Sequence, residues 1–449
     1  METKKKGFPA AFWVCACTEI FERLAYYLGR SLILIFVTAS VATGGLGLSD
    51  TVAANMQSNL TAFSYLLPLF GAVIVDKYIG ARYTTPVGMF IAAAGYFTGG
   101  IAKSATGVYA MIFLVSLGLA LFKNGAIIGR VITDKSQMDP AFSMRYTLVN
   151  VGAFIGTFLV GILYKDVFAK DGVLGFAPCF KMAALMMVLG GLWYIFVCWR
   201  FLGDLGKLPF KKTLTEEEKA AEAKKKEETG TKQPLTTIEK KRIGAIFVAS
   251  LFSIVFWIFW YLGYMPVYFY WAENMDWVVA GYQVPSTWFD AANSLFCVIL
   301  GPVTAALWKK LAARPQGDMS LFRKTGLGIA IIGVGYLFYA AIDILRGGEK
   351  ASVLWLIVFA FLLTMGEMFF SPLGHSFISK YSPSRYLAVM MSVWGFATFI
   401  AAKSYGPVYG LLFGGKIEFK VACIGVAVVS FVAALIMIAL DKKLSALVD

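Results

Sequence analysis

Apolar stretches about as long as a membrane-spanning helix recur along the whole chain. A helix needs roughly 20 consecutive apolar residues to cross the hydrocarbon core of a bilayer. We predict such spans at residues 10–38, 51–75, 84–102, 107–131, 145–164, 177–200, 243–270, 288–308, 324–345, 352–378, 386–412 and 419–440. About twelve spans of this length indicate an all-α, multi-pass membrane protein, because a membrane β-barrel would show shorter segments of alternating hydropathy.

The composition agrees with this prediction. Of 449 residues, 59% are hydrophobic and only 15% are charged, and the mean hydropathy is +0.70. A soluble chain carries about 25% charged residues. Residues 1–6 lead directly into the first span, so we expect no cleavable signal peptide. The six cysteines lie in or beside apolar segments without the spacing of a metal site, and we expect them to be small buried side chains.

The net charge of +14 is concentrated on one side of the predicted membrane topology. Lys and Arg are most frequent in alternate loops, which share a side with both termini and with a long polar segment. Because cytoplasmic loops are enriched in these residues, we expect both termini to lie in the cytoplasm. We expect the protein itself to reside in a plasma or inner membrane. Arg145, at the start of the fifth span, is counted among these cytoplasmic charges. No nucleic-acid partner is predicted, since topology explains the basic excess.

A polar, highly charged segment at residues 203–242 interrupts the series of spans. Such a composition cannot bury a core, so we expect a solvated cytoplasmic tether, with a regulatory role as the alternative. The segment separates six spans in residues 1–202 from six spans in residues 243–449. This organisation is typical of the major-facilitator fold, in which the substrate binds between the two six-helix bundles near the middle of the membrane. Gly152-x-x-x-Gly156 predicts close helix packing in the first bundle.

One face of the first predicted span is polar. Its residues follow helical spacing over three turns: Glu19, Glu22, Arg23, Tyr26, Tyr27 and Arg30. A charge at the bilayer centre costs about 2.5–3.5 kcal/mol, so this face should point into a polar interior rather than into lipid. The alternative is that the charges only join helices to one another.

Further charges lie well inside predicted spans, among them Lys123 in the fourth, Glu367 in the tenth and Lys403 in the eleventh. Arg30 and Lys123 are basic and belong to the first half, whereas Glu367 is acidic and belongs to the second half. A cavity with these charges suits a zwitterion, whose carboxylate would bind Arg30 and Lys123 and whose ammonium would bind Glu367.

Motifs of other protein classes are missing from the sequence. We find no phosphate-binding Walker A loop, no zinc-protease motif and no serine-hydrolase elbow. We therefore predict that the chain is not an enzyme, needs no cofactor, and moves its substrate by secondary or passive transport. A membrane receptor or enzyme is the alternative from another class, and no motif supports it.

The first span resembles a family signature. Glu19-x-x-Glu22-Arg23-x-x-Tyr26-Tyr27 is similar to the E-x-x-E-R-F-x-Y-Y motif of the proton-dependent oligopeptide transporter (POT) family, with Leu in place of the usual aromatic residue. Residues 65–71 with 76–80, 150–153, 288–293, 366–372 and 394 resemble the second, fifth, eighth, tenth and eleventh helices of that family, in the same order. The resemblance covers most of the chain.

The resemblance implies a monomer that imports di- or tripeptides with protons by alternating access, driven by the proton gradient. It implies a proton-coupling cluster of Glu19, Glu22, Arg23 and Lys123. It implies substrate contacts from Tyr26, Tyr27, Arg30, Tyr65, Lys123, Tyr146, Asn150, Asn293, Glu367 and Trp394. Asp76 and Arg82 would serve the cytoplasmic gate.

One departure from the family concerns the seventh span. The family has a glutamate there as a candidate proton carrier, whereas Phe256–Gly263 contains no acid. We hypothesise that Asp290 partly substitutes for it; the alternative is an ordinary acidic residue at a helix end. A second function therefore stays open, a related carrier of another small anion or zwitterion with altered or absent proton coupling. His375 is expected to be a packed histidine, with proton relay as the alternative.

Overall fold

The computed structural model describes residues 7–132, 137–209, 235–315, 317, 319–383 and 386–448. Within these ranges it leaves out the side chains of residues 139, 371–373, 375, 376, 379, 380, 388 and 448. Most of the polar segment predicted at 203–242 therefore lies outside the described residues, and so does the side chain of His375. The chain forms two compact units, which we describe separately.

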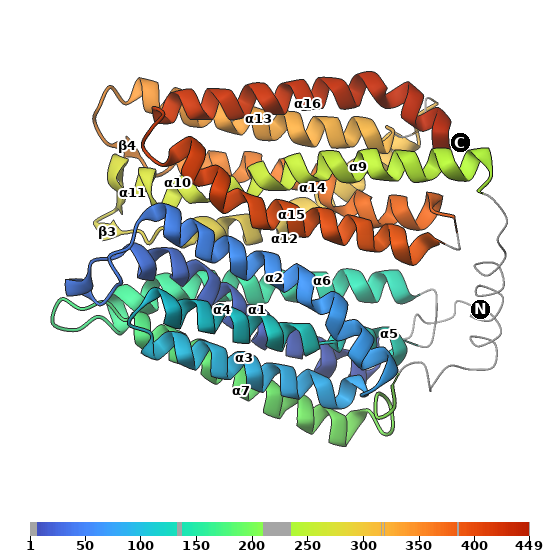
Figure 1. Ribbon diagram of the computed structural model, residues 1–449, viewed down its shortest axis with the longest axis horizontal. Helices are drawn as coiled ribbons and strands as arrows, with labels where there is room; N and C mark the ends of the chain where they lie inside the picture. The colour runs from blue at the N-terminus through green and yellow to red at the C-terminus, as the bar shows by residue number, and fades with distance from the viewer. Residues whose placement is uncertain are drawn as a thin grey trace. The chain divides into compact units, whose positions relative to one another are not determined.

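The first unit comprises Met1–Ser49 and Leu66–Leu214. Its helices are α1 (Ala10–Thr38), η1 (Val41–Thr43), α3 (Ala81–Ile101), α4 (Ala105–Leu121), α5 (Asn124–Val131), α6 (Met138–Ile162), η3 (Leu163–Val167) and α7 (Phe176–Phe201) (Figure 1). Helix α2 (Asp50–Lys77) is shared, because its first part, Asp50–Tyr65, belongs to the second unit. Helix α3 packs against α4 and α7, which bury much of its glycine-rich face, and α1 packs against α6 and α7.

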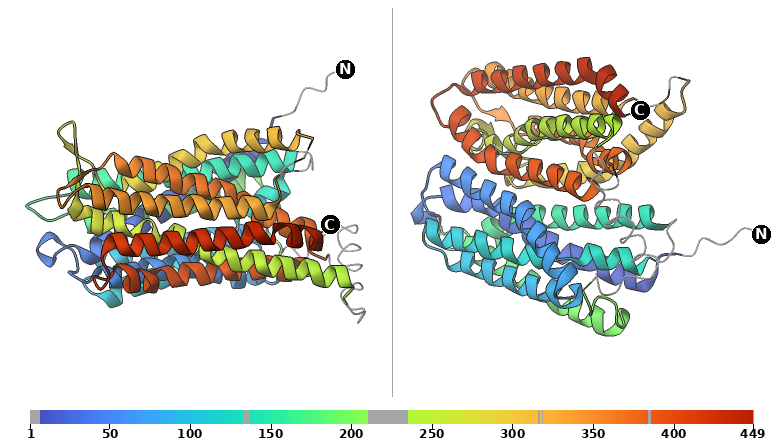
Figure 2. Two further views of the ribbon diagram at one scale, coloured as in Figure 1. Left: turned by 90° about the horizontal axis from the view of Figure 1, so that it is seen from above. Right: turned by 45° about the vertical axis from the view of Figure 1, so that its right-hand side comes forward.

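The second unit comprises Asp50–Tyr65 and Thr215–Asp449. Its helices are α9 (Thr237–Leu262), α10 (Met265–Tyr268), α11 (Tyr270–Asn274), α12 (Trp288–Ala312), α13 (Leu321–Leu345), α14 (Trp355–Tyr381), α15 (Leu387–Phe413) and α16 (Phe419–Val448). Helices α13 and α16 pack side by side (Figure 1 and Figure 2). Among the described residues, four two-residue strands lie in the loops: β1 (Met275–Asp276) pairs in parallel with β4 (Ala351–Ser352), and β2 (Val278–Val279) pairs antiparallel with β3 (Tyr282–Gln283).

The described residues contain eight helices that are long and apolar enough to cross a membrane. They correspond to the second, fourth, fifth, sixth, seventh, eighth, ninth and twelfth predicted spans. The other four predicted spans are the long helices α1, α3, α14 and α15. Helix α1 fails the same criterion for a clear reason, since its polar face holds four charged residues within twelve positions. The prediction of an all-α membrane protein is confirmed.

The fourth predicted span is two helices rather than one continuous helix. Lys123 separates α4 from α5 with a non-helical backbone (φ −125°, ψ 32°). Asn124 and Gly125 follow, and both residue types are poor helix formers in a helix interior. The Asn124 amide instead donates a hydrogen bond to the carbonyl of Cys15 on α1, at 2.8 Å. The break therefore lies at two residues whose side chains bind different helices, Lys123 to α2 and Asn124 to α1.

Helices α1 and α6 approach each other at two glycines, as the Gly152-x-x-x-Gly156 pattern predicts. A Cβ atom added at Gly152 would lie 2.9 Å from the carbonyl oxygen of Ile20, and one added at Gly156 would lie 2.5 Å from that of Leu24. Both neighbours are backbone atoms of α1, which cannot move aside as a flexible side chain can. The close approach fixes the face of α6 that meets the polar face of α1.

We expect Gly156→Ala to lower the stability of the folded protein by about 1–3 kcal/mol, the usual range for an overpacked contact. The reason is that the new methyl group meets the α1 backbone rather than open space. The measurement is the thermal unfolding midpoint of the purified protein in detergent. Gly395→Ala is the matched control, since a Cβ at that position on α15 has nothing within 4 Å. Equal midpoints for the two variants would contradict the packing argument.

Candidate substrate and proton site

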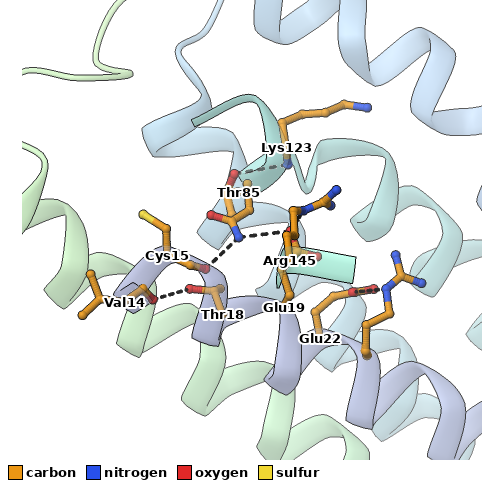
Figure 3. Close-up of polar contacts among 10 residues, drawn as sticks. Val14, Cys15, Thr18, Glu19, Glu22, Thr85, Lys123 and Arg145 are labelled. Atoms are coloured by element: carbon orange, nitrogen blue, oxygen red, sulfur yellow. Dashed lines mark hydrogen bonds and ion pairs between the residues drawn. The ribbon is translucent and has the colours of Figure 1, made fainter. Parts of the chain in front are cut away.

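Glu19 lies at the centre of a buried polar cluster in the first unit (Figure 3). Its side chain has no exposed surface. The Arg145 guanidinium, from α6, donates a hydrogen bond through Nε to Glu19 Oε1 at 2.9 Å. The Asn124 amide donates to the same oxygen at 3.1 Å. Glu19 is therefore held by two hydrogen bonds from different helices, one from a cationic donor and one from a neutral donor.

Glu22 lies one turn further along α1 and is bound differently. Its side chain is also fully buried, and Arg23 Nε lies 2.9 Å from Glu22 Oε2. The two groups are adjacent in the chain and are not aligned for a hydrogen bond, so neither Glu22 oxygen accepts one from the residues that the structure describes. A buried carboxylate without aligned donors is costly to keep ionised.

Lys123 does not pair with the acids of α1, in contrast to the arrangement that the family resemblance implied. In Figure 3 its side chain extends away from Glu19. Its ammonium donates a hydrogen bond to the carbonyl of Pro68 on α2 at 2.8 Å, and its backbone N–H donates to Thr85 Oγ1 at 3.3 Å. Asp76 is the acidic group that acts on Lys123 electrostatically. Pro68 lies inside α2, so this hydrogen bond joins the break between α4 and α5 to that helix.

The rest of the polar face of α1 is aromatic and basic. Tyr26 and Tyr27 meet edge to face, with ring centroids 5.3 Å apart. The Arg23 guanidinium lies 5.6 Å from the Tyr26 ring, and the Arg30 guanidinium lies 6.0 Å from the Tyr27 ring. Arg30 is buried. Cations at these distances are attracted by the rings, so the tyrosines help to hold both arginines on one face.

Arg82, a predicted gate residue, binds the end of α7 and the loop that follows it. Its guanidinium donates to the carbonyl of Cys198 at 2.7 Å and to the carbonyl of Gly203. In that loop the hydrogen bond and the charge of Lys207 lower the pKa of Asp204 below its ordinary value. Arg82 thus joins the start of α3 to the beginning of the polar segment. The gating roles of Asp76 and Arg82 stay predictions.

The second unit contains its own buried acid, Glu367 of α14. The Asn293 amide, from α12, donates to Glu367 Oε2 at 3.3 Å and to Thr364 Oγ1 at 2.8 Å. The Cys297 thiol lies 3.8 Å from the same Glu367 oxygen. The structure therefore brings together the two residues that the resemblance assigned to the substrate amine. It adds Thr364 and Cys297, which the sequence analysis missed.

Asp290 is buried near the start of α12. The hydroxyl of Tyr268, from α10, donates a hydrogen bond to Asp290 Oδ2. This places Asp290 in the interior of the second unit, in contact with α10, the short helix that follows the acid-free segment Phe256–Gly263. Its role in coupling stays a hypothesis.

The remaining predicted substrate residues differ in exposure. Tyr65 is exposed, and its hydroxyl accepts a hydrogen bond from Tyr261 at 3.2 Å. Trp394 is buried and stacks on Phe370, with centroids 5.8 Å apart.

Tyr146 is exposed on α6, and one turn later the Asn150 amide donates to its carbonyl at 3.0 Å. Lys403, predicted as an intramembrane charge, is exposed and donates to Asn59 Oδ1.

Arg145 is the main residue of the cluster that the sequence analysis missed, because it was counted with the cytoplasmic charges. A signal was present in the sequence. Arg145, Gly152 and Gly156 follow each other by seven and four residues, so they share one face of α6. Since the two glycines predict the face that packs against another helix, the same face carries Arg145 into that interface.

Three comparisons with known proteins give the same result. A model of the POT family matches residues 204–413. Relatives include a di-/tripeptide transporter of Lactococcus lactis subsp. cremoris, 24% identical over 86% of this chain and 86% of its own length. The peptide transporter YePEPT of Yersinia enterocolitica is 24% identical, covering 89% and 86%. The transporter YclF of Bacillus subtilis is 25% identical, covering 89% and 87%.

Solved structures show that the fold is shared. A crystal structure of a peptide transporter POT with sulfate superposes with a TM-score of 0.86, at 23% identity, over 99% of this chain and 98% of the other. A POT family transporter with 5-aminolevulinic acid gives 0.85, at 24% identity, over 98% of each chain. The predicted major-facilitator-type fold of a multi-pass membrane protein is confirmed. The family model, the relatives and the fold confirm the resemblance predicted from the first span, and the chain is related to the POT family of transporters.

Proposed function

We propose that this protein is a secondary transporter that moves di- or tripeptides together with protons by alternating access. The observation that carries the proposal is similarity along 86–89% of the chain to bacterial proteins named as di-/tripeptide or peptide transporters. The buried acid–base groups of both units support it, because a channel for a neutral solute has no need of them. The relatives give no support to the related carrier with altered or absent coupling.

The proposed chemistry assigns one end of the peptide to each unit. Arg30 and Lys123 receive the substrate carboxylate, and Glu367 with Asn293 receives its ammonium. Side chains that line the pocket are Tyr26, Tyr27, Tyr65, Tyr146, Asn150 and Trp394. Charge-assisted hydrogen bonds at both ends select a zwitterion of limited length. The proton binds at the acids of α1, with Asp290 as a second group in the other unit.

The remaining parts of the proposal follow from the topology. Residues 1–202 and 243–449 act as two bundles joined by a cytoplasmic tether at 203–242, and both termini are cytoplasmic. The protein works as a monomer, performs no covalent chemistry and needs no cofactor, since the proton gradient supplies the free energy.

The test is uptake of labelled dialanine into proteoliposomes under an imposed pH gradient, alkaline inside. We expect accumulation above the external concentration, which collapses when a protonophore is added. Liposomes without protein and proteoliposomes without a gradient are the controls. Peptide exchange that does not respond to the gradient would instead support the related carrier without proton coupling. Purified protein that moves no peptide in either assay would refute the proposal.

A further inference from the structure

The two buried acids of α1 differ in what holds them. Glu19 Oε1 accepts aligned hydrogen bonds from Arg145 and Asn124, on α6 and α5. Glu22 Oε2 lies 2.9 Å from Nε of its chain neighbour Arg23, and the Glu22 oxygens accept no hydrogen bond from the described residues. Both carboxylates have no exposed surface, so the difference does not come from access to water.

The charged and titratable groups around Glu19 come from several elements. Helix α1 contributes Glu22, Arg23 and the Cys15 thiol, and α6 contributes Arg145. Helix α7 contributes the Cys198 thiol, which interacts with Cys15. The nearby Lys123 ammonium is bound to the Pro68 carbonyl instead. Two carboxylates thus face two guanidinium groups, and the cluster is electrically balanced without Lys123.

Arg145 has the geometry of a permanent partner. Its guanidinium lies over Gly125 of α5: a Cβ added there would be 3.1 Å from Arg145 Cζ. The side chain is 29% exposed, whereas Glu19 is fully buried, so the arginine reaches inward from the rim of the cluster. An arginine stays protonated at any physiological pH, which makes it a fixed counter-charge.

We propose that Arg145 is a positioning residue for proton coupling: it holds Glu19 as a carboxylate and so confines the transported proton to Glu22. The physical reason is that protonating Glu19 would break an aligned charge-assisted hydrogen bond and leave the Arg145 charge without its counter-ion. Protonating Glu22 breaks no aligned hydrogen bond. The inference rests on the proposed function only where it concerns transport of the proton. The protonation states assigned to Glu19 and Glu22 do not depend on that function.

The direct test is infrared spectroscopy of the purified full-length protein, which detects the carbonyl band of protonated carboxyl groups as pH is varied. We expect Arg145→Met to gain one protonated carboxyl group at neutral pH relative to the unmodified protein. The double variant Glu19→Gln/Arg145→Met should lose that added band, because glutamine needs no counter-charge. Arg145→Lys should keep the original spectrum, since it keeps the cation.

A second variant tests the same inference in case Arg145→Met does not fold. Gly125→Val keeps the arginine in the sequence but fills the space beside its guanidinium, so it should push the guanidinium away from Glu19 and produce the same added band. Gly129→Val is the matched control on α5, because a Cβ there meets only Phe142 at 3.6 Å. An unchanged carboxyl band in both Arg145→Met and Gly125→Val, or an added band that Glu19→Gln does not remove, would overturn the inference.

Transport measurements test whether Arg145 affects proton coupling, and they distinguish failure of this inference from failure of the proposed function. If the unmodified protein accumulates dialanine, Arg145→Met should change the pH dependence of uptake, and Glu19→Gln/Arg145→Met should restore it. If the unmodified protein shows no response to the gradient, the proposed function fails, while the infrared result still decides the roles of Glu19 and Arg145. A pH profile unchanged in Arg145→Met, in a protein that does accumulate peptide, would overturn the coupling role.

Discussion

Replacing Glu22 by glutamine is expected to abolish gradient-driven accumulation of peptide while leaving peptide exchange intact. Glutamine has the shape of a protonated glutamate and cannot release a proton. Glu22 is fully buried, and its oxygens accept no hydrogen bond from the described side chains and backbone. The substitution therefore removes a charge that is costly to bury and breaks no aligned contact, so the fold and the binding site should survive it. Uptake under a pH gradient and counterflow without one, in the same proteoliposomes, measure the two activities separately.

The control for Glu22→Gln is Arg200→Met, which removes an exposed charge at the end of α7, where the guanidinium lies 5.6 Å from the Phe201 ring. It should keep both activities. Driven accumulation that survives in Glu22→Gln would show that another group carries the proton, with Asp290 as the next candidate. Loss of exchange as well as accumulation would show that Glu22 serves binding rather than coupling.

The polar face of α1 was predictable from the sequence because it depends on one helix only. Spacings of three and four residues place Glu19, Glu22, Arg23 and Arg30 on one face whatever lies opposite. The cost of a charge in lipid then requires that face to point inward. The structure agrees, since Glu19, Glu22 and Arg30 are all buried. The same argument gave the fold class, which follows from the length and hydropathy of single segments.

The partners of these charges depend on how helices pack, and there the sequence analysis was incomplete. Arg145 lies near the end of a span, where a count of loop charges assigns it to the cytoplasm, yet the close approach at Gly152 and Gly156 turns it toward Glu19. Lys123 was placed inside a continuous helix, whereas a break before Asn124 redirects its side chain to Pro68. Neither outcome follows from residue spacing, because both depend on the faces of two helices at once.

For the site in the second unit, too, some residues were predictable from the sequence and others were not. Glu367 and Asn293 were assigned to one role by the family resemblance, and the structure places their side chains in hydrogen-bond contact. Thr364 and Cys297 were not singled out, although each lies on the same helix face as a named residue: Thr364 is three residues before Glu367, and Cys297 is four after Asn293. The sequence does not single them out, because a threonine or a cysteine among the apolar residues of a span is more often a packing residue.

Glu367→Gln is expected to weaken binding of peptides with a free amino group by roughly 10- to 100-fold, because a hydrogen bond to a charged group contributes about 1.5–3 kcal/mol. Glutamine keeps the size of the side chain and can still accept from Asn293, which now lies 3.3 Å from Oε2. The variant thus removes the charge and little else. Competition of dialanine and of N-acetyl-dialanine against a labelled peptide measures the effect on each ligand.

The comparison of the two peptides isolates the role of the charge. N-acetyl-dialanine carries no ammonium, so its affinity should be nearly the same for Glu367→Gln and the unmodified protein, while that of dialanine falls. Ser430→Ala is the control, since this buried hydroxyl on α16 donates only to the Val426 carbonyl of its own helix. If both peptides weaken equally, Glu367 supports the fold of the site and does not bind the amine. The ammonium must then be held elsewhere, and Asp290, the other acid of α12 and α14 that the structure shows buried, would be the residue to substitute next.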